Sequence, residues 1–289
     1  FLDIEGDRKP APRHPTRMKM LWDDQALYIA ARLEEPHVWG TIGKHDAVIF
    51  HDPDFEVFLD PDGDGRLYAE LELNAKNATW DLLLPKPYQS GGRAIDAWEI
   101  AGLETAVSIE GTLNEPADVD RAWTVEIRWP WKGLKELTAR PSPPAVGDRW
   151  RINFSRVEWE TRIEKGKYVK LPGKPEANWV WSPQGVVDMH RPERWGVVQF
   201  AKSAPPGAKV DPDPSLPARR RLYAAYYAQR DFHKRKGRFA KSLAELGQGG
   251  GDLRLESTAA GFLLIAPADG AGKGAELRLD HEGWFTRSN

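Results

Sequence analysis

The sequence predicts a mainly β protein: an antiparallel, jelly-roll-like β-sandwich over residues 1–200, followed by a small C-terminal α+β domain over residues 218–289. Two observations predict it. Up to residue 200, short apolar or alternating runs are separated by Asp, Gly, Pro and Asn, which is typical of antiparallel sheets. Beyond residue 218 a helical period is followed by short strand-like runs. Residues 201–217 are rich in proline, so we expect a linker between the two.

The candidate strands of the first region are short runs in which Val, Ile, Leu, Phe, Tyr and Trp recur, often at every second position. They cover residues 26–33, 55–60, 67–74, 123–129, 150–157 and 195–200. Four tryptophans fall in or beside these patterns and are expected in the core: Trp22, Trp123, Trp150 and Trp195.

The second region begins with a predicted helix over residues 219–236, which places Leu222, Ala225, Tyr226 and Gln229 on one side and stops at Gly237. Short strands are expected at residues 253–257, 262–266, 276–279 and 284–286. The stretch that starts at Gly237 is loosely similar to pilin-like α+β segments, and no function is attached to that similarity.

Composition excludes several classes of function. The 41 Lys and Arg against 43 Asp and Glu leave a formal net charge of -2, which removes the basic field that nucleic-acid binding relies on. No apolar run reaches the length of a membrane span. The absence of Cys excludes disulfides, thiolate metal sites and a Cys nucleophile. The 13 Trp exceed what a core needs, so we expect some of them on a surface that stacks against a ligand.

Three candidate strands, at residues 68–74, 123–129 and 151–157, carry one apolar and one polar face. Alternation puts Glu70, Glu72 and Asn74 on one side of residues 68–74, and Arg151, Asn153 and Ser155 on one side of residues 151–157. A solvated outer face is one interpretation. The other is a ligand-binding face, since Glu, Asn and Arg form fixed, multiple hydrogen bonds to hydroxyl groups.

Four motifs in this order resemble the family 9 carbohydrate-binding modules and their relatives: Met20-Leu-Trp-Asp-Asp-Gln-Ala-Leu-Tyr-Ile-Ala-Ala, Phe55-Glu-Val-Phe-Leu-Asp-Pro-Asp-Gly-Asp, Trp123-Thr-Val-Glu-Ile-Arg-Trp-Pro-Trp and Arg194-Trp-Gly-Val-Val-Gln-Phe. The resemblance covers most of residues 1–200. It implies a β-sandwich that binds a mono- or oligosaccharide without catalysis, in glycan capture or degradation. It also implies an extracellular or periplasmic location, no required cofactor and structural calcium. It specifies neither the sugar nor the oligomeric state.

In that family two tryptophans clamp the sugar, and a strand Glu that aligns with Glu56 accepts hydrogen bonds from its hydroxyls. This chain has Phe50-His51 and Met189-His190 at the clamp positions, and Glu72 where an Arg is expected. Trp80 and Trp181 are the nearest substitutes for the clamp. The expected ligand-binding residues are therefore Glu56, Glu70, Glu72, Asn74, Trp80, Arg151, Asn153, Trp181 and His190.

Three alternatives stay open. Two carboxylates among Glu56, Glu70, Glu72 and Asp81 could flank a glycosidic bond in a glycoside hydrolase. A haem, as in relatives of the same sandwich, would use Met189 or His190 as an axial ligand. The acids Asp60, Asp62 and Asp64 recur at alternate positions as in a calcium loop, although Asp-Gly pairs also form hairpin turns, which we favour here.

Overall fold

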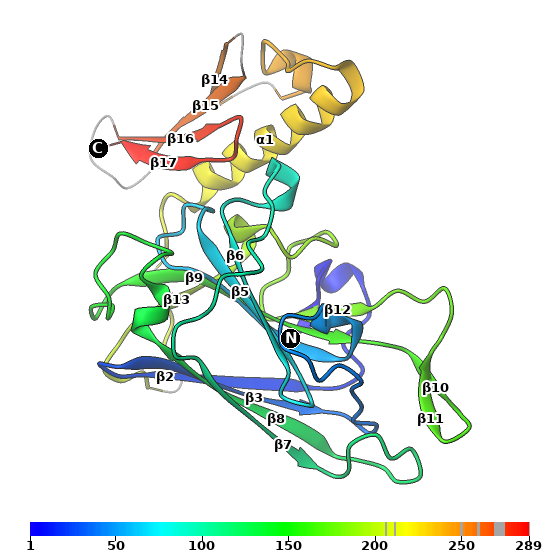
Figure 1. Cartoon of the computed structure of the whole chain (residues 1–289). Coiled ribbons are helices and arrows are strands. Elements are labelled where there is room, and N and C mark those ends of the chain that lie inside the picture. Colours follow the sequence, from blue (N-terminus) through cyan, green and yellow to red (C-terminus); the bar gives the residue numbers. More distant parts are fainter. Residues whose placement is uncertain (206, 211, 249–250, 259–260, 269–274, 289) are drawn as a thin grey trace.

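The computed structural model describes every residue except 206, 211, 249–250, 259–260, 269–274 and 289. Residues 1–200 form two main antiparallel sheets that face each other (Figure 1). The first has the strand order β2-β3-β8-β7, which are Thr16–Trp22, Ala26–Glu34, Ala122–Pro130 and Glu104–Glu110. The second has the order β1-β12-β9-β4-β5-β6, with β13 also paired to β9; these are Leu2–Asp3, Ala177–Val180, Arg149–Glu158, Asp54–Asp60, Tyr68–Asn74, Thr79–Leu84 and Gly196–Gln199. The predicted antiparallel β-sandwich is confirmed.

The remaining elements of this region are short. A hairpin, β10 (Thr161–Glu164) and β11 (Lys167–Lys170), extends away from the sandwich (Figure 1). Single-turn 3₁₀ helices connect the strands: η1 (Gly6–Arg8), η2 (Ile49–His51), η3 (Tyr88–Ser90), η4 (Trp131–Leu134) and η5 (Pro192–Arg194).

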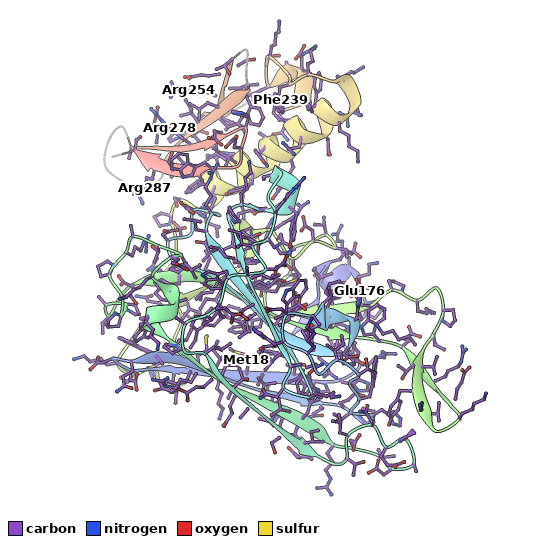
Figure 2. The ribbon with its side chains drawn as sticks, in the orientation of Figure 1. Met18, Glu176, Phe239, Arg254, Arg278 and Arg287 are labelled. Carbon is purple, nitrogen blue, oxygen red and sulfur yellow. The ribbon has the colours of Figure 1, made fainter. Side chains whose placement is uncertain are left out.

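The main core lies between the two sheets, where every second residue of each strand points inward. On β4 the inward residues are Phe55, Val57 and Leu59, all fully buried. Trp123 and Trp150 lie in this core as expected, and Trp22 packs against it. Figure 2 shows side chains filling this space, with Met18 of β2 among them.

The opposite face of the second sheet is also buried. A second apolar cluster covers it, formed by Phe58, Tyr68, Leu82, Leu84 and Trp195. Trp195 is therefore buried as expected, but outside the space between the sheets. The interpretation of this face as solvated is wrong, because loops cover it and shield its polar side chains from water.

The C-terminal region forms helix α1 (Leu216–Lys236), the turn η6 (Ala244–Leu246) and a sheet with the order β14-β15-β16-β17, which are Arg254–Ser257, Phe262–Pro267, Glu276–Asp280 and Phe285–Ser288. The predicted helical face is buried against this sheet through Leu222, Ala225 and Tyr226. The helix ends at Gly237, whose positive φ of 69° suits glycine. Among the described residues, no helix combines the length and apolar character that crossing a membrane requires.

The C-terminal region rests directly on the sandwich. Tyr226 and Ser90 share a hydrogen bond of 2.7 Å between their hydroxyl groups, and Tyr227 donates one of 2.8 Å to Glu193. At the start of α1, Arg219 donates to the carbonyl of Gly63 over 2.8 Å. These contacts bring the N-terminal end of α1 close to the turn that follows β4.

Candidate functional site

A row of polar and aromatic side chains crosses the covered face of the second sheet. Glu56 of β4 lies opposite Glu72 of β5 and opposite Ser155 of β9. Glu72 in turn lies opposite Trp80 of β6. Residues that are directly opposite in an antiparallel sheet project from the same face, so four strands contribute neighbouring side chains to one place.

This row opens into a cavity of about 240 Å³. Loop residues complete its lining: Phe50 from η2, Tyr88 from η3 and the segment that ends at His190. The full lining is Ile4, Phe50, Glu56, Phe58, Glu70, Glu72, Trp80, Leu82, Tyr88, Val157, Glu176, Asn178, Val187, Asp188, Met189 and His190. We call this cavity the acidic pocket. Tyr88 and Val187 remain exposed, so the pocket meets solvent at these residues.

Buried carboxyl groups dominate the acidic pocket. Glu56, Glu70 and Glu72 are each no more than 4% exposed, and Asp54, beside them on β4, is fully buried. One oxygen of Glu56, one of Glu70 and one of Asp54 have no hydrogen-bond partner within the described protein. Glu72 accepts one hydrogen bond from the backbone N–H of Phe50 at 3.0 Å. The protein thus leaves several buried acceptors free for a ligand.

No positive side chain offsets these acids: among the described residues that line the pocket, none is Lys or Arg. Burial raises the pKa of Glu56 to about 7. Burial and the charge of Glu56 raise the pKa of Glu70 well above its ordinary value. Burial, followed by the charges of Asp54 and Glu56, does the same for Glu72. Near neutral pH Glu56 is therefore close to the midpoint of its titration, so its carboxyl group can donate or accept a hydrogen bond.

His190 is a neutral member of this site. Burial lowers its pKa to about 3, so the imidazole is uncharged at neutral pH. Its Nδ1 is hydrogen-bonded to the Tyr68 hydroxyl at 2.9 Å, and its Nε2 lies 3.8 Å from a carboxyl oxygen of Glu70. The ring also packs against Tyr88, with 4.4 Å between ring centroids. His190 thus packs against Tyr88 and lies beside Glu70 at one end of the acidic pocket.

One of the alternatives fits this geometry poorly. The glycoside hydrolase alternative stays open, because one oxygen each of Asp54, Glu56 and Glu72 lies within 4.8 Å of the others and carboxyl groups therefore meet on this face. A haem exceeds a drug-sized ligand, for which pockets of about 300–1,000 Å³ are usual, so a cavity of about 240 Å³ does not suit it.

Five of the expected site residues lie together in the acidic pocket: Glu56, Glu70, Glu72, Trp80 and His190. The amides of Asn74 and Asn153 share the face but are used by the protein. Asn74 donates to Ile42 and Asp52 and accepts from two backbone N–H groups, which closes the turn after β5. Asn153 exchanges two hydrogen bonds with the backbone of Ser182. Both amides are structural and lie outside the pocket.

Arg151, Trp181 and Asp81 also lie elsewhere. The Arg151 side chain donates to the carbonyl of Trp195 and lines a different cavity; burial and then the charge of Arg219 lower its pKa to about 10. Trp181 packs against Phe154 at the sandwich core, so its ring is no platform for a ligand. Asp81 points to the other face of β6, where it accepts a hydrogen bond from the N–H of Ile100 at 2.6 Å.

Sequence reasoning missed several residues in or beside the pocket. Asp54 follows from the same alternation that selects Glu56, since the two are separated by two positions on β4. Tyr88, Phe50 and Glu176 come from loops that carry no periodic signal. Figure 2 shows Glu176 beside β12, at the end of a loop.

The Asp60–Gly65 turn has a donor set that suits calcium. One oxygen each of Asp60, Asp62 and Asp64 lies within 4.8 Å of the others. Burial and the charges of the other two acids raise the pKa of Asp60 to about 8. One oxygen of Asp62 is buried without a hydrogen-bond partner. The segment is also the tight turn that the sequence favours, because Asp60 accepts hydrogen bonds from the N–H groups of Gly63 and Gly65.

Neither a protein-family model nor a curated protein matches the chain. The solved structures that are similar to it include the following three. Two are structures of a family 9 carbohydrate-binding module from Caldicellulosiruptor kristjanssonii. The complex with glucose has a TM-score of 0.42 and 16% sequence identity, and the match covers 70% of this chain and 83% of that chain. The complex with cellotriose has a TM-score of 0.41 and 16% sequence identity, and the match covers 70% of this chain and 84% of that chain. The third is a protein from Bacteroides uniformis assigned to carbohydrate binding. It has a TM-score of 0.48 and 14% sequence identity, and the match covers 69% of this chain and 84% of that chain. The function of this chain is inferred below from its own pocket.

Proposed function

We propose that this protein binds a carbohydrate without catalysis, and that one sugar unit occupies the acidic pocket. The proposal rests mainly on one observation: buried carboxyl oxygens without hydrogen-bond partners and aromatic rings line the same small cavity, which is open to solvent. A buried polar group without a partner costs about 1–3 kcal/mol, and sugar hydroxyls would supply the missing partners for Glu56 and Glu70.

The aromatic residues complete the match to a sugar. A pyranose has an apolar C–H face that packs on an aromatic ring, while its hydroxyls require donors and acceptors around its edge. Trp80, Tyr88 and Phe50 line the same cavity as the carboxyl groups. The cavity is smaller than the range of about 300–1,000 Å³ that encloses drug-sized ligands, so it suits a single sugar unit, with the rest of a longer glycan in solvent.

Charge narrows the class of sugar. The pocket holds several acids and, among its described lining residues, no Lys or Arg that would pair with the charge of a uronic acid or a sulfated sugar. The ligand that suits it is a neutral sugar. The resemblance in sequence motifs adds a role in glycan capture or degradation outside the cytoplasm, which belongs to the same proposal.

Calcium is proposed as a structural ion at the Asp60–Gly65 turn. Asp60, Asp62 and Asp64 would hold it, and a divalent cation would relieve the repulsion among their carboxylates. Its contribution would be to fix the turn that joins β4 to β5, the two strands that carry Glu56 and Glu72.

A glycan array tests the proposal, with the labelled protein, Glu70→Gln and Glu72→Gln, and with glucose and cello-oligosaccharides among the neutral sugars. The expected result is binding to neutral glycans that both variants lose, while acidic glycans give no signal. Loss of binding through lost folding is excluded by circular dichroism of each variant.

Three outcomes would overturn the proposal: no glycan above background, glycan binding that both variants retain, or cleavage of an oligosaccharide that Glu→Gln exchange abolishes. A divalent cation that binds this pocket, shown by calorimetric binding lost in Glu72→Gln with no glycan bound, would also contradict it.

A further inference from the structure

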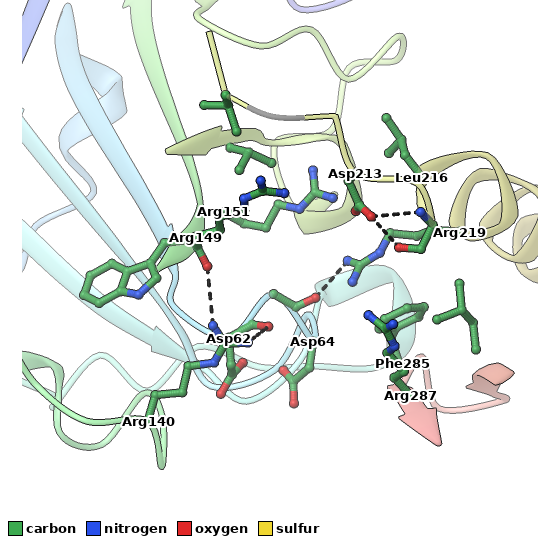
Figure 3. Close-up of a pocket in the computed structure, with 16 residues that line it drawn as sticks. Asp62, Asp64, Arg140, Arg149, Arg151, Asp213, Leu216, Arg219, Phe285 and Arg287 are labelled. Carbon is green, nitrogen blue, oxygen red and sulfur yellow. Dashed lines mark hydrogen bonds between the residues drawn. The ribbon is translucent and has the colours of Figure 1, made fainter. Parts of the chain in front are cut away.

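A second and larger cavity, of about 570 Å³, lies where the C-terminal region meets the sandwich. Figure 3 shows its lining, which comes from the turn after β4, the start of β9, the start of α1 and the strand β17. Its main feature is the convergence of five arginine side chains: Arg140, Arg149, Arg151, Arg219 and Arg287. They come from segments that are distant in the sequence, so only the folded chain brings them together.

Most of these guanidinium groups are not matched by acids. Within the part of the chain that the structure describes, Arg140, Arg151, Arg219 and Arg287 form no ion pair with a carboxylate within 4.0 Å. Arg140 donates to the carbonyl of Asp62, and Arg151 to that of Trp195 at 2.9 Å. The hydrogen-bond partners of Arg140 and Arg151 are therefore neutral carbonyl groups, while the charge of Asp213 offsets part of the positive charge of Arg151 and Arg219.

The acids near the cavity are already engaged. Asp213 accepts hydrogen bonds from both the N–H and the hydroxyl of Ser215, at the start of α1. Asp62 accepts one from the Thr138 hydroxyl at 2.8 Å. Asp64 accepts one from the N–H of Arg66 at 2.8 Å. Among the described lining residues other than Arg149, the four arginines Arg140, Arg151, Arg219 and Arg287 outnumber these three acids.

The guanidinium group of Arg219 is held in place by neighbouring groups and keeps one donor without a partner. It donates to the carbonyl of Gly63 and stacks on the ring of Phe285, with 3.8 Å from its central carbon to the ring centroid. Its Nε is buried and has no hydrogen-bond partner in the described protein. It also lies in the first turn of α1, where the helix dipole adds positive potential. A side chain fixed in this way loses little entropy when an anion binds.

We propose that this cavity binds a small ligand that carries carboxylate, sulfate or phosphate oxygens, held by Arg151, Arg219 and Arg287. A guanidinium presents parallel N–H donors that match two oxygens of such a group. Arg287 comes from β17 and Arg151 from β9, so the ligand would contact both the C-terminal region and the sandwich. The two cavities of this protein would then differ in the charge of the ligand they select: a neutral sugar in one and an anion in the other.

Isothermal titration calorimetry on the full chain tests the proposal, at constant ionic strength set with chloride. Inorganic phosphate, inorganic sulfate, glucuronate and a sulfated monosaccharide are titrated separately, which distinguishes free inorganic anions from acidic sugars. Arg219→Gln and Arg287→Gln are compared with Arg220→Gln, an exposed residue of the same helix that loses the same charge outside the cavity.

The expected result is that at least one of these anions binds, that Arg219→Gln and Arg287→Gln each weaken it roughly tenfold or more, and that Arg220→Gln leaves it within about twofold. If Arg219→Gln fails to fold, Arg287→Gln decides, because Arg287 is exposed at the cavity edge. The proposal is overturned if none of the four anions binds, or if Arg220→Gln weakens binding as much as Arg287→Gln does.

Discussion

Replacing Glu56 with Gln is expected to stabilise the protein, and to do so more strongly at pH 8 than at pH 5. Glu56 is only 4% exposed, and burial raises its pKa from the ordinary 4.5 to about 7. In the unfolded chain the group ionises near pH 4.5, whereas in the folded chain it keeps its proton up to about pH 7. Between these values the unfolded chain binds fewer protons, so the stability that Glu56 contributes falls as the pH rises.

The size of the effect follows from this pKa difference. Each pH unit of difference is worth about 1.36 kcal/mol, so the penalty is about 3 kcal/mol at pH 8 and about 1 kcal/mol at pH 5. Gln has the same shape and no ionisation, so the variant avoids this penalty. It also relieves the repulsion that Glu56 exerts on Glu70 and Glu72. The stabilisation should therefore grow by about 2 kcal/mol over this range.

The assay is urea unfolding at pH 5 and pH 8 and constant ionic strength, followed by circular dichroism. Glu104→Gln serves as the matched control, because the Glu104 side chain is 69% exposed and its pair with Arg128 lies at the surface. The control should change the free energy of unfolding by no more than about 1 kcal/mol at either pH. A Glu56→Gln variant that is less stable than the parent at pH 8, or whose effect does not grow with pH, refutes this account of the pocket.

Two further predictions concern residues outside the acidic pocket. Trp181→Ala should lower the free energy of unfolding by about 2–4 kcal/mol in urea titrations, because it removes a ring packed on Phe154. The same variant should leave glycan binding unchanged. Loss of glycan binding at full stability would instead make Trp181 a ligand residue. Calcium should raise the melting temperature of the parent protein in differential scanning calorimetry and have no effect on Asp62→Asn, with chelator-treated protein as reference. Equal melting temperatures with calcium and with chelator would exclude a structural calcium ion at this turn.

The strand faces could be predicted from the sequence, because alternation depends only on local backbone geometry. Glu70 and Glu72 do share one face of β5, and Asn153 lies on the matching face of β9. What covers a face depends on segments far away in the chain. Tyr88 and the loop that ends at His190 cover this sheet, and these segments show no periodic pattern of apolar residues from which their position could be predicted.

The use of each polar group could not be predicted either. Asn74 and Asn153 are of the residue type, and lie on the face, expected of residues that bind a sugar. Their side-chain amides instead donate hydrogen bonds to the backbone carbonyls of Ile42 and Ser182. Such pairings depend on how loops pack, which a single sequence does not reveal. Trp181 illustrates the same limit of sequence patterns, because its polar neighbours indicated a surface residue while the ring packs on the sandwich core.

The central claim is that the acidic pocket holds a sugar against its aromatic rings. Calorimetric titration of the neutral sugar that binds best tests it most directly, with the parent protein, Tyr88→Ala and the control Trp284→Ala, which removes an exposed ring outside the pocket. The expected result is binding that falls roughly tenfold or more in Tyr88→Ala, as loss of a stacking ring predicts, and is unchanged in Trp284→Ala. Equal affinities for all three proteins, or a failure of every neutral sugar to bind the parent, would contradict the claim.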